Sequence, residues 1–301
     1  MRLPEWIKVK SPIGVHDTKQ ILRNHRLSTV CEEARCPNMG ECFSKPTATF
    51  MILGSACTRN CGFCSVGISK SKPLNDESNP PLPPFSKGGM GGFSDEPERV
   101  ALAAKDMGLK YVVVTSVTRD DLPDGGAVHF AETVRAVKKH LPKTTVEVLT
   151  PDFKGSYNSL KTVLDSAPDV YNHNVETVPR LYPYVRPQAN YERSLNVLRN
   201  AKKIALDINA KSGLMVGLGE TFNEVISVLK DLNDAGCDTV TIGQYLRPSK
   251  QNLPVKEYVR PEIFNEYKKT AVKIGFKYVA SSPLVRSSMN AEEMYTTVNS
   301  R

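Results

Sequence analysis

The sequence predicts an α/β fold with a mostly parallel sheet, and three observations support this. From residue 48 onward, short runs rich in β-branched and aromatic residues alternate with amphipathic segments of helical length. The chain has 301 residues, of which 40% are hydrophobic, which is enough for a substantial core. Polar or glycine-rich motifs directly follow several predicted strands. Repeated strand–helix units form parallel sheets with right-handed crossovers, so we expect a doubly wound sheet or a barrel, complete or partial.

Six predicted strands are separated by helix-like segments. They cover residues 48–54, 111–117, 145–150, 169–175, 213–219 and 239–246, and a late strand is expected at 276–285. Residues 72–95 break the alternation because they are rich in Pro, Gly and Ser, and we expect a flexible insertion there. We therefore expect an N-terminal extension (1–47), a central α/β unit (48–276) and a C-terminal strand and tail (277–301). Motifs after parallel strands share one face, where we expect the active site.

The composition limits the classes of partner and compartment. The formal net charge is +8, but no run of five Lys or Arg residues occurs, so an acidic protein or an anionic ligand is favoured over nucleic acid. No apolar stretch approaches the roughly 20 residues that span a bilayer, and the N-terminus MRLPEWIKVK lacks the apolar core of a signal peptide. We expect a soluble, cytoplasmic protein. Seven cysteines in a reducing compartment indicate metal binding or catalysis rather than disulfides.

Three cysteines lie within the eight residues CTRNCGFC, which follow the first predicted strand. Cys57, Cys61 and Cys64 are spaced C-x3-C-x2-C. A 4Fe–4S cluster needs one ligand per iron, so three cysteines leave one iron open. Structural zinc, the alternative, requires four ligands and normally two C-x2-C pairs, and this motif supplies only one. The spacing favours a cluster with an open corner.

A C-x3-C-x2-C motif after the first strand of such a series resembles the radical S-adenosylmethionine (SAM) superfamily. The resemblance implies a partial (β/α)6 TIM-like barrel in which the amino and carboxylate groups of SAM bind the open iron. It also implies that Phe63 lies beside the adenine. We further expect residues 1–30 and the 286–301 tail to close over the carboxyl ends of the strands, because they bracket the ligands of a second cluster.

That second site is predicted from a cysteine trio upstream. Cys31, Cys36 and Cys42 are spaced C-x4-C-x5-C among Glu, Arg, Asn and Pro, which favours an auxiliary cluster over scattered buried thiols. The two motifs in this order resemble the lipoyl synthase family, as do TSVTRDDLPDGGA, NHNVETVPRLY, KSGLMVGLGET and ASSPLVRSS. The resemblance implies a serine as fourth auxiliary ligand, either Ser288 as first choice or Ser287.

Three positions depart from the family pattern, and one cysteine stands apart from both motifs. Met289 replaces a Tyr, Ser282 a Gly and Asn252 a His. Met289 puts the packing around the serine ligand in doubt, and Ser282 raises the question of whether that backbone needs a positive φ. Cys237 precedes a predicted strand and is expected to be a buried structural thiol.

The resemblance also implies contacts to SAM and to substrate. The residues expected at SAM are Phe63, Thr115, Ser116, Asn172, Asn174, Lys211, Met215 and Gly217, with Arg186 as a further carboxylate partner. Those expected at the substrate are Arg119, Asp120 and Arg286. Asn172 and Asn174 should share one side of their strand, with His173 pointing away. For Gly213, Met215, Gly217 and Glu220, an ordinary strand packed on a helix is an equal alternative.

The implied reaction inserts two sulfur atoms, at C6 and C8, into an octanoyl chain carried by a lysine of an acceptor protein. The family uses two SAM molecules per product and takes sulfur from the auxiliary cluster. The expected acceptors are lipoyl-domain proteins or the glycine-cleavage H protein, and the expected electron donor is a ferredoxin or flavodoxin. Competing hypotheses are a biotin-synthase-like sulfur inserter, a two-cluster electron carrier of ferredoxin type, and a nucleic-acid-modifying enzyme.

Overall fold

A computed structural model describes residues 3–9, 15–44, 48–68 and 94–299 of the chain. They form one sheet with the strand order β1-β2-β5-β6-β7-β8-β9-β10, in which β1 pairs antiparallel with β2 and the other neighbours pair parallel. The strands are β1 (Ser28–Thr29), β2 (Thr49–Ile52), β5 (Tyr111–Ser116), β6 (Thr145–Leu149), β7 (Val170–Asn172), β8 (Asn209–Val216), β9 (Thr239–Gln244) and β10 (Tyr278–Ser281). Two short strands, β3 (Ala56–Cys57) and β4 (Gly67–Ile68), form a separate parallel pair.

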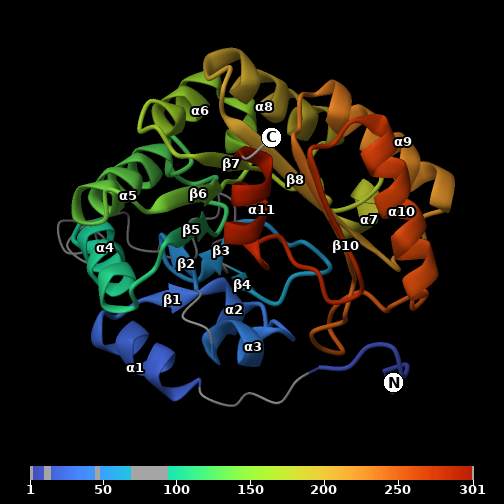
Figure 1. The fold of residues 1–301 in the computed structure, drawn as a ribbon, viewed down its shortest axis with the longest axis horizontal. Helices are drawn as coiled ribbons and strands as arrows, with labels where there is room; N and C mark the ends of the chain where they lie inside the picture. The colour runs from blue at the N-terminus through green and yellow to red at the C-terminus, as the bar shows by residue number, and fades with distance from the viewer. Residues whose placement is uncertain (1–2, 10–14, 45–47, 69–93, 300–301) are drawn as a thin grey trace, which may run out of the picture.

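Helices cover the outer face of the curved sheet, as Figure 1 shows. The crossover helices are α4 (Glu96–Asp106), α5 (Ala127–His140), α6 (Tyr157–Leu164), α8 (Tyr191–Ile204), α9 (Phe222–Asp234) and α10 (Pro261–Ile274). Each buries one apolar stripe: in α5, Phe130, Val134 and Val137 are buried, and basic residues complement the helix dipole in its last turn. Shorter elements are η2 (Phe153–Gly155), η3 (Pro179–Leu181) and α7 (Tyr182–Val185).

The predicted α/β fold is confirmed, with two refinements. The late strand becomes β10, which adds a further parallel strand beside β9, and β1 and β10 are the two edges of the described sheet, so the barrel is partial. Strand β8 begins at Asn209, before the predicted start at 213, because its polar side chains are satisfied inside the protein. The Lys211 ammonium contacts Glu147, and the Ser212 hydroxyl donates to the His173 carbonyl. The predicted insertion at 72–95 lies almost entirely outside the described residues.

The N-terminal region lies beside the β1 edge, where Figure 1 shows α1 (His16–Asn24), α2 (Val30–Glu33) and α3 (Met39–Ser44) grouped below β1 and β2. The C-terminal tail divides into two parts. Residues 285–289 line the main cavity at the carboxyl ends of the strands, as expected. Helix α11 (Ala291–Asn299) instead packs Ala291 and Met294 against Tyr111 and Val170, which are the first residues of β5 and β7. It therefore covers the opposite end of the barrel, because its buried apolar side chains require that surface.

No helix in the described ranges is both long enough and apolar enough to cross a bilayer.

Candidate active site

The main cavity, of about 1040 Å³, lies at the carboxyl ends of the parallel strands. Residues at the ends of β5, β6, β8 and β9 line it, including Ser116, Leu149, Met215 and Gln244. The six cysteines of the two motifs line it as well: Cys31, Cys36, Cys42, Cys57, Cys61 and Cys64. Within the described ranges, none of the six is joined in a disulfide. The two trios, which are separate in the sequence, therefore face the same space.

The loop of the first motif is closed by β3 and β4, which pair Cys57 with Ile68. Its outer side packs against two other segments through the backbone of Gly62, which donates to the Val185 carbonyl and accepts from the Leu253 amide, both at 2.9 Å. A Cβ at Gly62 would lie 2.8 Å from the Leu253 side chain, so the close approach favours glycine. The Asn252 side chain donates to the Cys64 carbonyl at 2.7 Å. Asn252, one of the three residues that depart from the family pattern, thus supports the cysteine loop directly.

The second motif lies on two short helices and the segment between them, and it is tied to the C-terminal tail. Cys31 is in α2, whose N-terminus is capped by the Thr29 hydroxyl, and Cys42 is in α3. Between them, the Asn38 amide donates to the Leu284 carbonyl at 2.6 Å and contacts the Met289 sulfur at 3.3 Å. Met289 therefore has a defined partner.

The tail passes very close to β9 at Gly243. A Cβ at Gly243 would lie 2.2 Å from the Val285 carbonyl oxygen, so this approach requires glycine. Ser282, where the family has glycine, is not among the described residues with positive φ, so its conformation is available to serine.

The donor set fits iron–sulfur clusters better than zinc. Within the described ranges, no three His, Cys, Asp or Glu side chains converge closely enough to hold a single metal ion. Structural zinc requires such a closed tetrahedral set, whereas a 4Fe–4S cluster spreads its thiolates over separate irons. Burial raises the pKa of Cys31 and of Cys64 to about 12, and it also raises the pKa of Cys61. These thiols must lose protons when they bind iron.

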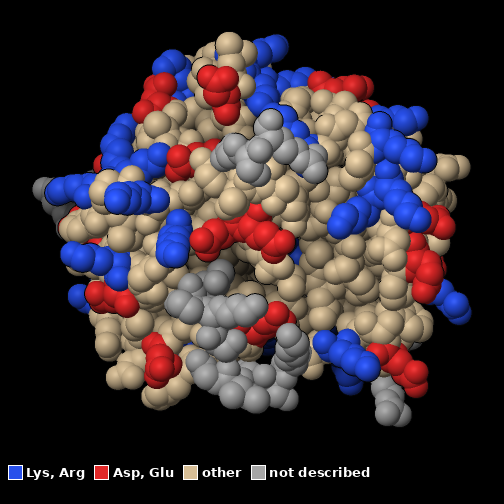
Figure 2. All heavy atoms as spheres, viewed as in Figure 1, with Lys and Arg blue, Asp and Glu red and all other residues tan. Residues whose placement is uncertain are grey.

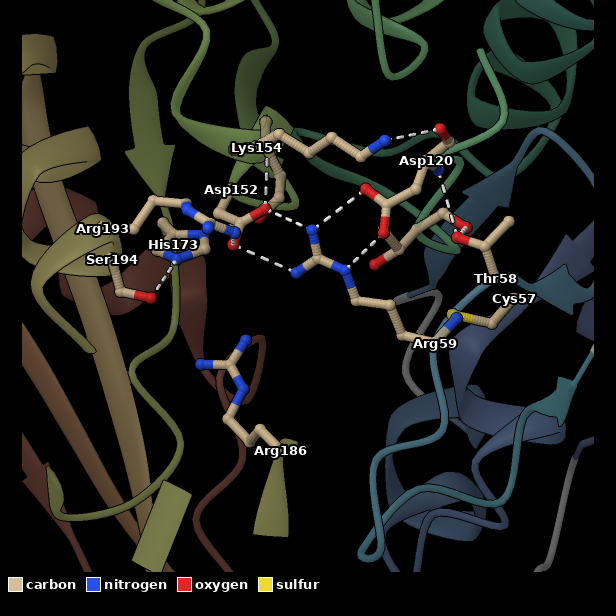
Figure 3. Close-up of polar contacts among 12 residues, drawn as sticks. Cys57, Thr58, Arg59, Asp120, Asp152, Lys154, His173, Arg186, Arg193 and Ser194 are labelled. Atoms are coloured by element: carbon tan, nitrogen blue, oxygen red, sulfur yellow. Dashed lines mark hydrogen bonds and ion pairs between the residues drawn. The ribbon is translucent and has the colours of Figure 1, made fainter. Parts of the chain in front are cut away.

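Arg59 connects the first cysteine loop to the ends of two strands (Figure 3). Its guanidinium, in a residue only 5% exposed, makes paired hydrogen bonds to Asp120 at 2.7 and 3.0 Å and to Asp152 at 3.0 and 2.6 Å. Asp120 follows β5 and Asp152 follows β6. Burial acts to raise the pKa of Asp152, but hydrogen bonds and charge from Arg59 override it and hold that pKa at about 2. Arg193 of α8 also pairs with Asp152, at 3.4 Å.

A second polar group lines the cavity after β7. Glu176 has a φ of 65°, a left-handed conformation that is costly for a non-glycine residue and concentrates at functional sites. Its carboxylate accepts from the Asn174 amide at 3.2 Å, and burial raises its pKa. Arg186 donates to the Asn174 and Val175 carbonyls at 3.1 Å, but its Nε is buried without a partner among the described residues. A carboxylate and an incompletely satisfied cation therefore stand close together in the cavity wall.

Below the cavity, a polar network fills the barrel interior. Lys211 Nζ lies 3.0 Å from both oxygens of Glu147, and both side chains are almost fully buried. The Asn172 amide donates to Glu147 at 2.7 Å and to the Ser287 hydroxyl at 2.9 Å, and that hydroxyl donates to Asn174 at 3.2 Å. Asn172, the last residue of β7, and Asn174, just beyond it, thus point to the same side, as predicted.

His173 points the other way, also as predicted. It contacts the Thr150 carbonyl and the Ser194 hydroxyl of α8, and burial lowers its pKa to about 4. Cys237 is buried, as expected of a structural thiol.

The structure separates the predicted contact residues into two groups. Those that line the cavity are Phe63, Thr115, Ser116, Asn174, Met215, Arg186, Arg286, Ser287 and Ser288. Those engaged elsewhere are Asn172, Lys211, Gly217, Arg119 and Asp120. Gly217, with φ at 101°, forms a turn against Gln244, and Arg119 pairs with Asp121 at 2.6 Å. Sequence reasoning missed three further site residues, Arg59, Asp152 and Glu176. The signal available was their position: Arg59 lies inside the cysteine motif, and Asp152 and Glu176 follow strands β6 and β7.

A partial parallel barrel with a C-x3-C-x2-C loop at the carboxyl ends of its strands defines a class of enzymes, and the comparisons agree. The family model of the radical SAM superfamily matches residues 51–232. Solved structures share the fold. Streptococcus suis SuiB bound to S-adenosylmethionine has a TM-score of 0.56 and 13% identity, covering 89% of this chain and 56% of that chain. HydG, a maturase of the [FeFe]-hydrogenase, has a TM-score of 0.52 and 14% identity, covering 97% of this chain and 79% of that chain. These likenesses concern the fold alone.

Sequence comparison narrows the class to one family. The model for the N-terminal domain of lipoyl synthase matches residues 1–36. Lipoyl synthases of Caldicellulosiruptor bescii and Caldanaerobacter subterraneus are each 55% identical, over 97% of this chain and 95% and 96% of their own lengths. The chain therefore belongs to the lipoyl synthase family of the radical SAM superfamily. SAM and 4Fe–4S clusters are the cofactors of this family, and its reaction transfers sulfur.

Proposed function

We propose that this chain forms the lipoyl group by inserting two sulfur atoms at C6 and C8 of an octanoyl chain held in amide linkage on a lysine of an acceptor protein. The observation that carries the proposal is that both cysteine trios face one cavity. Unactivated C–H bonds have no proton that a side chain could remove, so acid–base catalysis cannot begin this reaction. SAM and its cluster, when bound, supply the radical that removes hydrogen from such a bond.

The two trios would hold different clusters. Cys57, Cys61 and Cys64 would hold the cluster that binds SAM, and two SAM molecules would be used per product. Cys31, Cys36, Cys42 and a serine would hold the auxiliary cluster, which would donate the sulfur. Each trio supplies three soft thiolate ligands, which suit a 4Fe–4S cluster whose fourth iron has a ligand other than cysteine.

Hydrogen bonding favours Ser288 over Ser287 as the serine ligand. The Ser287 hydroxyl already accepts from Asn172 and donates to Asn174, so its oxygen is committed to the barrel interior. Ser288 lines the cavity beside it. A serine oxygen is a hard ligand for iron and would be released readily from a cluster that is consumed. The half-buried Arg286 guanidinium, near Cys36, would offset part of the cluster's negative charge.

The polar wall after β7 suits the two charged groups of SAM. The Glu176 carboxylate would receive the amino group of SAM, and the Arg186 Nε, which has no partner among the described residues, would bind its carboxylate. Ser116, whose buried hydroxyl also has no partner in the described part of the chain, adds a third polar contact. Phe63, Thr115 and Met215 stay in the proposal as cavity-lining residues, whereas the contacts of Asn172, Lys211 and Gly217 lie elsewhere.

An acidic acceptor protein fits the border of the cavity. Arg35, Arg247 and Lys250 line it and are exposed, whereas the carboxylates of Asp152 and Glu176 in its wall are not exposed. An acidic lipoyl domain or H protein would be steered to this border, as would a ferredoxin or flavodoxin as electron donor. Figure 2 shows one face of the molecule, on which Lys and Arg are scattered around the edge and acidic groups lie both among them and near the centre.

The test is anaerobic reconstitution with iron and sulfide, followed by reductant, SAM and an octanoyl-lysine peptide, with the product followed by mass spectrometry. We expect about eight irons per chain and a peptide that gains two sulfurs. In Ser288→Ala the auxiliary cluster should be lost or altered, whereas Ser287→Ala should keep all four of its ligands. SAM cleavage without sulfur transfer would retain the superfamily chemistry and reject the proposed substrate. Bound zinc would reject the cluster assignment.

A further inference from the structure

We propose that Arg59 and Asp152 are positioning residues of the SAM site: the Arg59 guanidinium fixes the 57–64 loop to the ends of β5 and β6 and so sets the direction in which the open iron faces the cavity. The inference rests on the proposed function only in requiring that a cluster forms on Cys57, Cys61 and Cys64. It assigns a role to a side chain that lies within the cysteine motif but is not itself a ligand.

The geometry of Arg59 is unusual for a residue of an open loop. Its side chain is 4% exposed, and it faces two carboxylates in paired fashion (Figure 3). The shortest contact, 2.6 Å, joins Arg59 Nη2 to Asp152 Oδ1, and the Asp152 side chain is fully buried. Because Arg59 lies between Cys57 and Cys61 in the chain, its buried contacts restrain the backbone that carries both sulfurs.

The partners of Arg59 are themselves held in place. Asp152 accepts from the Lys154 amide at 3.1 Å and pairs with Arg193 of α8. Asp120 donates its backbone amide to the Thr58 hydroxyl at 3.1 Å, so this partner also contacts the cysteine loop through its main chain. The contact therefore joins the loop to three rigid elements, β5, β6 and α8.

The chemistry of the contact favours orientation over simple stabilisation. A buried ion pair is a weak source of folding free energy, because desolvation of its charges offsets their attraction. A planar guanidinium between two carboxylates nevertheless fixes direction as well as distance, which a lysine ammonium cannot do. Contacts behind metal ligands commonly determine how the ligands point, and their removal costs roughly 10–100-fold in affinity or activity.

The experiment compares Arg59→Lys, Arg59→Met and Asp152→Asn with a matched control, Asp238→Asn. Asp238 is also a buried carboxylate that pairs with two cations, Lys202 and Lys277, but it lies at the start of β9, away from the cavity. For each reconstituted protein we would count iron, measure the dissociation constant of SAM, and record the electron paramagnetic resonance spectrum of the reduced cluster with and without SAM.

We expect all four variants to retain about eight irons. The Arg59 and Asp152 variants should bind SAM roughly 10–100-fold more weakly and show a reduced SAM-induced spectral change. Asp238→Asn should lose stability but match the wild-type protein in SAM affinity and spectrum. Arg59→Lys should not restore either readout, because it keeps the charge and loses the planar fork.

Wild-type SAM affinity and spectrum in Arg59→Lys would overturn the proposal, since charge alone would then suffice. Equal behaviour of Asp152→Asn and Asp238→Asn would overturn it as well, as would loss of iron from the Arg59 variants, which would assign the contact to assembly rather than orientation. Failure of the proposed function is distinguishable: a wild-type protein that binds SAM but transfers no sulfur would leave all of these comparisons measurable.

Discussion

Removing the ammonium group of Lys211 tests the polar network inside the barrel. In Lys211→Met, Glu147 keeps a buried carboxylate and loses the cation that lies 3.0 Å from both of its oxygens. Breaking a buried pair from one side costs about 3–5 kcal/mol, because the remaining charge is uncompensated. Total stabilities are about 5–15 kcal/mol, so this loss is a large fraction of the free energy of unfolding. The double variant Lys211→Met with Glu147→Gln removes both charges and should recover most of the loss.

The assay is anaerobic urea unfolding, with the midpoint and the slope measured for the wild-type protein and both variants. The single variant should unfold at a lower urea concentration, by about 1–2 M, with an unchanged slope. A loss below about 1 kcal/mol, or a double variant no more stable than the single one, would refute the reasoning about the buried pair. SAM binding to the folded Lys211→Met variant also tests whether Lys211 contacts SAM. A large loss of SAM affinity would support the contact that the family resemblance implies.

Three further predictions concern the site. Asp152 has a folded-state pKa of about 2, below its ordinary 3.8. Its contribution to stability is therefore complete above pH 4 and is lost as the pH falls toward 2. Acid unfolding of the wild-type protein should show a loss of about 2 kcal/mol in the free energy of unfolding, and Asp152→Asn should lack this loss. Gly243→Ala places a Cβ 2.2 Å from the Val285 carbonyl, so the tail must shift, and iron counting should show loss of the auxiliary cluster but not of the other. Ser287→Ala removes the hydroxyl between Asn172 and Asn174, and protease digestion should cleave the tail faster while the iron count stays unchanged.

Much of the fold could be predicted because parallel strands carry a local signal. Strand β5, YVVVTS, is an apolar run that is buried from Tyr111 to Thr115, and helix α9 begins with a capping box between Thr221 and Glu224. Strand β8 was placed too late because Lys211 and Ser212 look unfit for a buried strand. Their partners, Glu147 and the His173 carbonyl, come from other strands, so no window of local sequence could reveal them.

The candidate site shows the same division between local and distant information. Cysteine spacing within one loop is a local property, and it predicted two trios that do face one cavity. The alternation of Asn172, His173 and Asn174 also followed from strand geometry. The family resemblance predicts Asp120 at the substrate, but its carboxylate pairs with Arg59, and this pairing joins positions 61 residues apart. A charged side chain after a strand indicates that it lies at the carboxyl ends of the strands. It does not indicate whether another residue of the protein already pairs with that charge.

The two cysteine trios are supported in different ways, and this difference bears on their separate roles. The loop of Cys57, Cys61 and Cys64 is joined to β5 and β6 through a buried ion pair, so its position is tied to the rigid barrel. The trio of Cys31, Cys36 and Cys42 lies on two short helices and the segment between them, which the Asn38 amide joins to the tail. A cluster used repeatedly to bind SAM requires a fixed orientation, because displacement of a reacting group by about 1 Å can cost 10²-fold in rate. A cluster that donates its own sulfur must be dismantled and rebuilt, and the neutral hydrogen bonds from Asn38 to the tail can open for that purpose at a smaller free-energy cost than a buried ion pair.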